Sequence, residues 1–301
     1  MHRLWSILFG SVLGVCGVVS LLSPLLGWKL PENAASYGPR VDNLFHLILA
    51  ITAIAFVLTE VILVVALWRF GSRPGSKSPY VHGHHRLEMI WTAVPAGILL
   101  FIAFAQVSAW ADIKYQSRMP DPDQIFEVSA RQFEWRFRYP TADQLENMTT
   151  KWKDDRGKAA ADWEKRPQAD DVHVVNEVHI WKDAKVRMYL KTKDVLHSFF
   201  LPNLRIKQDA LPGKTIPVFF DAQEANCKYD DATKTYQFGR FDAKTNEFKP
   251  DKSMGWELAC AELCGWGHYK MRGRLYVHET KDDYLRWLKM AEEKQNATKR
   301  E

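Results

Sequence analysis

The chain has 301 residues, which is enough for about two domains. Its formal net charge of +5 is small and its basic residues are scattered, which argues against a nucleic-acid-binding protein. Four cysteines are too few for a disulfide framework in a chain of this size. The mean composition hides a division, because the first third is apolar whereas the remainder is charged and rich in aromatic residues.

Three apolar runs in the first third are long enough to cross a membrane. They cover residues 4–28, 44–68 and 89–110, and a bilayer core requires about 20 apolar residues of helix. The loop between the second and third runs has no acidic residue, and its basic residues are Arg69, Arg73, Lys77 and Arg86. Short basic loops stay on the cytoplasmic side. Residues 42–111 are therefore predicted to form a transmembrane hairpin, with everything downstream on the outer face.

The first run allows two interpretations. Residues 1–28 have a charged start and a long apolar stretch, which suits either a cleaved signal or a third transmembrane helix. The apolar stretch is longer than that of a typical signal, and no small-residue cleavage site follows closely. The sequence therefore favours a retained helix.

Residues 112–279 have the pattern of an all-β domain. Apolar and polar residues alternate with period two after Pro122, and β-branched and aromatic residues are frequent. The segments that predict strands are 125–130, 133–139, 173–181, 185–192, 215–220 and 272–279. Short strands without long helices between them indicate a β-sandwich or a Greek-key barrel.

Two insertions and a final helix complete the predicted organisation. Residues 141–172 are dense in both charge signs, which indicates a solvated, partly helical excursion without chemistry, and residues 223–252 form a second insertion. Residues 280–301 predict a helix, with Thr280 and Asp283 suited to a capping box. The apolar face of that helix consists of Tyr284, Trp287, Leu288 and Ala291.

The stretch CAELCGWGHYKM, residues 260–271, gathers metal-binding side chains: Cys260, Cys264, His268 and Met271. A local disulfide is possible in an oxidising outer compartment, but it leaves His268 and Met271 unexplained. Zinc accepts thiolate and imidazole, whereas thioether is a poor zinc ligand. Copper accepts all three groups. A single blue-copper ion uses one cysteine, so it would leave the second cysteine unused. Two coppers bridged by both thiolates would use all of these side chains.

Two such coppers require a second histidine, and His197 is the candidate. It lies in KDVLHSFFLPNLRIKQDALPG, where we expect it to follow a strand, in an apolar turn bounded by Pro202 and Pro212. A lone histidine in such surroundings is by default a packed core residue, but the cysteine cluster favours a ligand. Cys227, in the second insertion, has no such neighbours and is interpreted as a free or incidental thiol.

These motifs together resemble subunit II of the haem-copper cytochrome c oxidases. The resemblance rests on EMIWTAVPA, DVLHSFFLP, LRIKQDALPG and CAELCGWGHYKM in that order, and it covers residues 44–278 apart from the insertions. It implies an N-terminal transmembrane helical hairpin, with or without a further N-terminal helix, followed by an all-β cupredoxin-like Greek-key barrel. It also implies a binuclear copper A centre on that barrel.

The resemblance implies that metal is held by His197, Cys260, Glu262, Cys264, His268 and Met271. The two cysteines are implied to bridge the coppers, and each histidine to complete one of them. The thioether of Met271 is the implied axial ligand of one copper, and the backbone carbonyl of Glu262 that of the other. The Glu262 side chain is implied to face a magnesium ion shared with subunit I.

Four further residues receive roles in catalysis from the same resemblance. Glu88 matches an acid at the mouth of a proton pathway, although an acid near a helix N-terminus is also stabilised by the helix dipole. Asp194 matches an acid that helps to dock cytochrome c. Phe133 stands where the family's electron-entry tryptophan normally is, while Trp135 is retained.

The segment around Phe133 also departs from the family in its charge, because it contains Arg131, Arg136 and Arg138. A basic cytochrome docks best on an acidic surface, so the usual donor is in doubt. A different or a membrane-tethered c-type cytochrome is the alternative. The chain has no C-x-x-C-H motif, so we expect the donor haem to belong to another protein.

The implied function is that of the electron-entry subunit of an oxidase in a bacterial-type inner (cell) membrane. Electrons from a c-type cytochrome would pass to haem in subunit I, where oxygen is reduced to water and protons are pumped. The expected partners are subunit I, other oxidase subunits, the cytochrome and membrane lipid. Three alternatives remain: a quinol-oxidase-type subunit II, which lacks the copper ligands; the copper A domain of nitrous oxide reductase; and a membrane-tethered copper-delivery or sensing protein.

Overall fold

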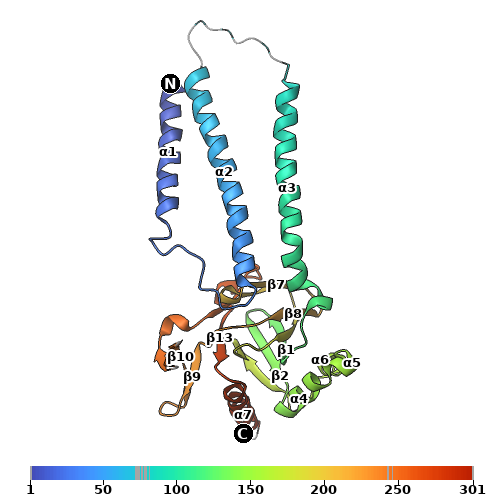
Figure 1. Cartoon of the computed structure of the whole chain (residues 1–301). Coiled ribbons are helices and arrows are strands. Elements are labelled where there is room, and N and C mark those ends of the chain that lie inside the picture. The colour runs from blue at the N-terminus through green and yellow to red at the C-terminus, as the bar shows by residue number, and fades with distance from the viewer. Residues whose placement is uncertain are drawn as a thin grey trace. The chain divides into compact units, whose positions relative to one another are not determined.

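The structure is a computed structural model that describes every residue except 1, 72–74, 76, 78, 79, 81, 243, 246, 300 and 301 (Figure 1). Arg73 of the predicted basic loop therefore lies outside the described residues. The chain forms two compact units. A membrane unit comprises Met1–Pro31 and Arg40–Ala109, and a β domain comprises Glu32–Pro39 and Trp110–Glu301.

Within the described residues, three helices are long and apolar enough to cross a membrane. They are α1 (His2–Leu22), α2 (Gly38–Phe70) and α3 (His85–Lys114). A helix satisfies its own backbone hydrogen bonds, which an apolar bilayer requires. In the membrane unit, the Ser6 hydroxyl of α1 donates to the Val64 carbonyl of α2 at 2.9 Å. The predicted hairpin and the additional N-terminal helix are confirmed as helices.

The described part of the β domain is built on two five-stranded sheets. The first has the order β3 (Val172–Val175), β2 (Glu134–Tyr139), β1 (Gln124–Arg131), β5 (Val186–Thr192), β8 (Ile216–Phe220). The second has the order β4 (Glu177–Trp181), β13 (Arg272–His278), β12 (Glu257–Cys260), β6 (His197–Leu201), β7 (Ile206–Ala210). Short 3-10 helices are η1 (Gln116–Arg118), η2 (Pro202–Leu204), η3 (Lys252–Met254) and η4 (His268–Lys270).

The two sheets face each other and enclose the core. Trp135 of β2 packs edge to face on Phe199 of β6 with ring centroids 5.3 Å apart, and both side chains are fully buried. Strands that follow one another in the chain repeatedly change sheet, as β3 to β4 and β4 to β5 do. This sandwich confirms the predicted cupredoxin-like, Greek-key class of fold.

The predicted strand 173–181 is wrong, because it consists of β3 and β4 in different sheets. Asn176 separates them with a φ of +60°, a left-handed conformation that asparagine tolerates better than most residues. Its side-chain carbonyl accepts the Trp135 N–H at 2.8 Å, and its backbone carbonyl accepts the Arg274 N–H at 2.9 Å. The turn therefore lets one run of β-forming residues serve both sheets.

The first insertion is helical as expected, but it is not simply solvated. It forms α4 (Ala142–Thr150), α5 (Trp152–Asp155) and α6 (Lys158–Lys165). Thr141 and Gln144 close a capping box at the start of α4. Leu145, Met148 and Trp163 are buried in the main core cluster. Apolar residues at helical spacing within a charged segment produce this inward face.

Arg138 of β2 joins this insertion to the sheet. Its guanidinium forms ion pairs with Glu127 of β1 and, at 2.7 Å, with Asp171. It also stacks over the Trp163 ring, with 3.9 Å from Cζ to the ring centroid. All three charged side chains are buried, so each charge depends on its partners for the solvation that water would otherwise supply.

We predict that Arg138→Met lowers the unfolding free energy of the β domain by about 3–5 kcal/mol, because two buried carboxylates lose their shared partner. Urea unfolding of the detergent-solubilised full chain, followed by tryptophan fluorescence, measures the change. Arg166→Met is the control, since Arg166 is exposed. Equal unfolding curves for the two variants would show that Arg138 contributes no net stability.

The second insertion forms a separate three-stranded sheet of β9 (Cys227–Asp230), β10 (Thr235–Phe241) and β11 (Phe248–Pro250). Cys227 is a free thiol, as expected, and it is 1% exposed. Burial raises its pKa far above the ordinary thiol value. Cys227 is therefore a packed core residue that remains protonated at neutral pH.

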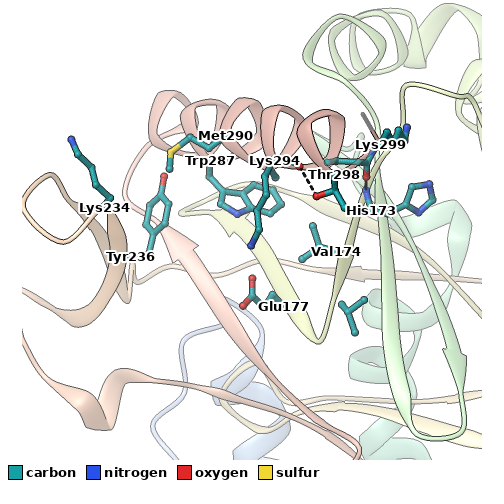
Figure 2. A pocket seen from close by; sticks show the side chains of 13 residues that line it. His173, Val174, Glu177, Lys234, Tyr236, Trp287, Met290, Lys294, Thr298 and Lys299 are labelled. Carbon is teal, nitrogen blue, oxygen red and sulfur yellow. Dashed lines mark hydrogen bonds between the residues drawn. The ribbon is translucent and has the colours of Figure 1, made fainter. Parts of the chain in front are cut away.

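The C-terminal helix α7 (Lys281–Thr298) packs on the second sheet through stacked rings. Thr280 caps it by accepting the Asp283 N–H at 3.1 Å, which is one half of the predicted capping box. The buried His179 ring of β4 stacks on Trp287 of α7 with centroids 3.7 Å apart, and its Nδ1 lies 3.0 Å from Nε2 of buried His278. A pocket opens beside this stack, with Trp287 and Glu177 in its lining (Figure 2).

This histidine pair predicts acid sensitivity. Burial holds the pKa of both His179 and His278 well below 6.5, so both are neutral in the folded protein, whereas the unfolded chain takes up protons below about pH 6.5. The stability that the two neutral histidines contribute is therefore fully present above about pH 6.5 and is lost as the pH falls below it. Each histidine contributes a slope of about 1.4 kcal/mol per pH unit.

We expect His278→Asn to reduce that slope by the contribution of one histidine, in urea unfolding at pH 5.0 to 6.5 monitored by near-ultraviolet circular dichroism. His278 is chosen because Glu177 Oε2 lies 3.5 Å from His179 Nε2, so a His179 variant would also alter that contact. The control is His85→Asn at an exposed position of α3. Identical slopes in wild type and His278→Asn would contradict the assignment.

Candidate metal centre

The pairing of β12 with β6 brings the metal-binding side chains together. Cys260, the last residue of β12, lies opposite Phe199 of β6 in the sheet register. The Ala261 N–H donates to the Ser198 carbonyl at 2.9 Å, and the Cys260 N–H donates to the Met271 carbonyl at 3.1 Å. The second bond closes the base of the loop 260–271, so its ligand-type side chains lie beside the start of β6.

His197 occupies that start, which corrects the expectation that it lies in a turn after a strand. It is the first residue of β6 and is fully buried. Its position follows from the alternation HSFFL, which places His197, Phe199 and Leu201 on the same side of the strand. The imidazole therefore points into the sandwich with the core side chains.

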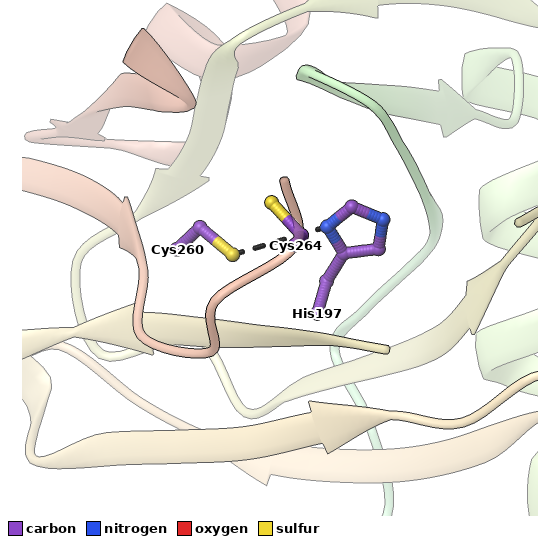
Figure 3. A group of neighbouring side chains, drawn as sticks. All are labelled: His197, Cys260 and Cys264. Atoms are coloured by element: carbon purple, nitrogen blue, oxygen red, sulfur yellow. Dashed lines mark hydrogen bonds between the residues drawn. The ribbon is translucent and has the colours of Figure 1, made fainter. Parts of the chain in front are cut away.

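Ligand-type atoms of His197, Cys260 and Cys264 lie within 4.8 Å of one another (Figure 3). The Cys260 Sγ is 3.9 Å from His197 Nδ1. All three side chains are buried, and the two cysteines are free thiols. Because the sulfurs are not bonded to each other, the local-disulfide interpretation does not describe this structure.

The remaining expected ligands approach the sulfurs from the loop. The Cys264 Sγ lies 3.6 Å from His268 Nδ1 and 3.9 Å from Met271 Sδ. The backbone carbonyl of Glu262 lies 3.3 Å from the Cys260 Sγ, while the Glu262 side chain is exposed. Among the described residues, His268 does not join the compact group of three. The two imidazoles therefore approach different sulfurs.

The two thiols have opposite acidities. Burial opposes ionisation of Cys260, but hydrogen bonds from the His197 side chain and the Ser198 backbone outweigh it and lower the pKa of Cys260 to about 6. Burial and the neighbouring Cys260 raise the pKa of Cys264 to about 11. Burial lowers the pKa of His197, yet Cys260 and Asp194 raise it above the ordinary value overall. The site thus stabilises one thiolate beside one thiol.

The hairpin between β1 and β2 holds both ligand-bearing segments. Asp194 Oδ1 lies 2.8 Å from His197 Nε2, and Asp194 Oδ2 accepts the Gln132 N–H at 2.7 Å. The Gln132 side chain donates to the Cys264 carbonyl at 2.5 Å. Gln132 was not among the residues that the sequence singled out, because it is 132 positions away from Cys264.

The two aromatic candidates contact different parts of the site. Trp135 is fully buried and packs edge to face on the His197 ring, with centroids 6.1 Å apart. Phe133 is partly buried and packs on Trp266 of the metal loop, with centroids 5.2 Å apart. An inner and an outer aromatic ring therefore flank the cluster.

Two of the other sequence candidates lie elsewhere. Glu88 is exposed in the first turn of α3, in the membrane unit, which is separate from the unit with the metal cluster. Arg138 was expected to make the surface near Phe133 basic, but its charge is buried between Glu127 and Asp171. Of that arginine group, Arg131 and Arg136 remain on the surface, and both bind Glu134.

The chain thus combines apolar helices of membrane-spanning length with a cupredoxin-like domain that holds a cluster of cysteine, histidine and methionine side chains, which defines the class of a membrane protein with a candidate metal site. Residues 25–108 match the family model for the transmembrane domain of cytochrome c oxidase subunit II, and residues 125–235 match the model for its periplasmic domain. The two matches span more than half of the chain. This chain belongs to the cytochrome c oxidase subunit II family, as a membrane protein with an extracytoplasmic domain.

Individual relatives agree over most of the chain. It is 26% identical to a cytochrome c oxidase subunit 2 from Thermostichus vulcanus, over 90% of this chain and 81% of the relative. It is 27% identical to an alternative cytochrome c oxidase subunit 2 from Bradyrhizobium diazoefficiens, over 89% of this chain and 84% of the relative.

Among solved structures, the periplasmic domain of subunit II of cytochrome oxidase (CoxB) from Bradyrhizobium japonicum aligns with 58% of this chain and 98% of its own. The sequence identity is 18% and the TM-score 0.38. The periplasmic family match ends at residue 235, before the loop 260–271. The geometry of the cluster is therefore an argument independent of that match.

We predict that Gln132→Leu weakens metal binding by about 10–100-fold, the usual effect of losing a group that positions a ligand. The variant removes the bond to the Cys264 carbonyl but keeps the backbone N–H that holds Asp194. Competition between the copper-loaded full chain and a chelator measures the affinity. The control is Gln223→Leu at an exposed position, and equal affinities for both variants would refute the role of Gln132.

Proposed function

We propose that this chain is the electron-entry subunit of a cytochrome c oxidase and holds two copper ions in a binuclear copper A centre. Cys260 and Cys264 would bridge the ions, His197 and His268 would complete one each, and the Met271 thioether and the Glu262 carbonyl would be axial ligands. The observation that carries the proposal is the approach of one imidazole to each of two adjacent free sulfurs.

The donor set fits copper better than zinc. Copper binds thiolate, imidazole and thioether together, and all three groups are present within one buried cluster. A structural zinc site is usually tetrahedral with nitrogen and thiolate ligands, which leaves the fully buried Met271 sulfur beside Cys264 without a role. Two cysteines also exceed the single thiolate that a mononuclear blue-copper site uses.

Bound copper would supply one-electron chemistry at this position. The residues of the chain would hold the ions and exclude water from them, because the ligand side chains are buried apart from the half-buried His268. Asp194 and Gln132 orient His197 and Cys264 through the hydrogen bonds described above. Ligands that are held by the fold change position little when charge is added, which favours fast electron transfer.

The partner reactions belong to the same proposal. A c-type cytochrome would donate electrons at the outer surface, and subunit I would receive them at haem, reduce oxygen to water and pump protons. Glu88 would stand at the mouth of a proton pathway, and the exposed Glu262 side chain would face a magnesium ion at subunit I. The chain would be a multi-pass protein of a bacterial-type inner membrane, in agreement with its apolar helices.

The experiment that tests the proposal is a metal count and an electron paramagnetic resonance spectrum of the copper-loaded full chain in detergent. We expect two copper ions per chain and one unpaired electron shared between two copper nuclei. His197→Ala is predicted to abolish the shared signal, whereas His173→Ala, at an exposed position of β3, leaves it intact.

Other outcomes favour the alternatives. A single localised copper would refute the binuclear centre and favour a tethered copper-delivery or sensing protein. Absence of bound copper would favour a subunit of the quinol-oxidase type. Preference for zinc over copper would refute all copper-based functions.

A further inference from the structure

The metal loop presents two large aromatic side chains to solvent. Trp266 is 81% exposed and Tyr269 is 64% exposed, and both lie between Cys260 and Met271. Proteins seldom leave such rings in water without a reason, and exposed apolar surface of this kind marks interaction sites. Tryptophan and tyrosine are also the residues that most often dominate binding energy in protein interfaces.

The backbone of the loop directs Trp266 outward. The Phe133 ring lies against Gly265 and Gly267 on either side of Trp266, and a Cβ atom at Gly267 would collide with that ring. Trp266 in turn packs edge to face on Phe133. The two glycines therefore let the Phe133 ring lie close to the loop backbone, where it packs on the indole.

Trp266 is also close to the metal-binding residues along the chain. It is two residues from Cys264 and two from His268. An electron that arrives at the indole therefore has a short covalent path to two of the proposed ligands. Phe133 is less exposed than Trp266, because it is partly buried and packs edge to face on the indole.

A basic side chain lies beside these two rings. The Lys270 ammonium lies 5.5 Å from the Tyr269 ring centroid and 6.0 Å from that of Trp266. On the adjoining hairpin, Arg131 and Arg136 share the single carboxylate of Glu134. Glu262 is the one acidic residue between Cys260 and Lys270. The Asp194 carboxylate is bonded to the hairpin at the Gln132 N–H and to His197, whereas Lys270 places a cation directly beside the exposed aromatic surface.

We propose that Trp266, Tyr269 and Lys270 form the docking surface for the electron donor, and that the donor is a c-type cytochrome with acidic side chains around its exposed haem edge. This inference rests on the function proposed above. One electron leaves the ferrous haem of the donor, which becomes ferric, and passes to the metal centre of this chain. Apolar contact at Trp266 provides the close approach, and Lys270 selects an acidic partner.

The test uses the full chain in its detergent-solubilised oxidase complex, with two soluble c-type cytochromes as probes, one acidic and one basic. Surface plasmon resonance measures binding of each ferric cytochrome, and oxidation of each ferrous cytochrome gives kcat and KM. Oxidation of tetramethyl-p-phenylenediamine, which is small and needs no protein docking surface, reports whether the metal centre remains competent. Copper content and the electron paramagnetic resonance spectrum are recorded for every variant.

We expect Trp266→Ser to weaken binding of the acidic cytochrome about tenfold or more and to raise its KM, as truncation of an interface tryptophan does. Oxidation of the small reductant and the copper spectrum should not change. Trp266→Phe should restore most of the affinity. Lys270→Glu should raise KM for the acidic cytochrome and lower it for the basic one, whereas Lys158→Glu, in the helical insertion, should change neither.

The proposal is overturned if Trp266→Ser leaves binding and KM unchanged, or if neither cytochrome binds the wild-type complex. The choice of an acidic partner is overturned if Lys270→Glu changes binding and KM equally for the acidic and the basic cytochrome. If Trp266→Ser loses copper, its weaker binding no longer tests the docking surface. Trp266→Phe and Lys270→Glu then provide the test, because both variants keep an aromatic ring at position 266 that packs on Phe133. A wild-type chain without the shared copper signal would refute the proposed function separately, whether or not a cytochrome binds.

Discussion

The antiparallel pairing of β12 with β6 is the constraint on which the candidate metal centre depends. Cys260 and His197 are 63 residues apart in the chain, and they meet because these two strands share backbone hydrogen bonds. The same register brings the Ala261 N–H to the Ser198 carbonyl. A shift of one residue would turn His197 to the other face of the strand and away from both cysteines. Sheet register, more than loop chemistry, therefore sets the geometry of the site.

The hairpin between β1 and β2 is the second element that shapes the centre. Gln132 holds the Cys264 carbonyl and, through Asp194, the His197 imidazole. The next residue, Phe133, covers the two loop glycines, and Trp135 packs against His197 from within. Successive positions of one hairpin thus orient the ligands, exclude water and support the exposed indole of Trp266. The same hairpin therefore contributes both to the candidate metal site and to the proposed docking surface.

Stability away from the metal cluster depends on buried polar groups. Arg138 connects the helical insertion to the first sheet, and the His179–His278 pair connects the second sheet to α7. Such groups are costly to bury unless each is satisfied by its neighbours. The helical insertion and α7 are therefore integral parts of the β domain, and their loss would expose charges or rings that the sandwich alone cannot accommodate.

Much of the architecture could be predicted because its cause is local. The three membrane helices follow from the length and hydropathy of their own segments. Strands β1, β2, β5, β8 and β13 follow from alternation within a few residues, and the C-terminal helix follows from its cap and apolar face. No strand was predicted at β6, β7 or β12, which form the sheet around the candidate metal centre. The chemical composition of the loop 260–271 was sufficient to favour copper over zinc, because ligand preference depends on the side chains themselves.

The features that escaped prediction all depend on contacts between distant segments. Asn176 divides one β-forming run because its side chain and backbone bind both sheets. His197 begins a strand because β7 and β12 lie beside it. Arg138 is buried because Glu127 and Asp171 converge on it, and Gln132 reaches Cys264 across the folded domain. The sequence by itself determined the membrane helices, the C-terminal helix, several of the strands and the chemistry of the metal-binding side chains. Only the tertiary structure decided which side chains meet, because burial and register are properties of the whole sheet.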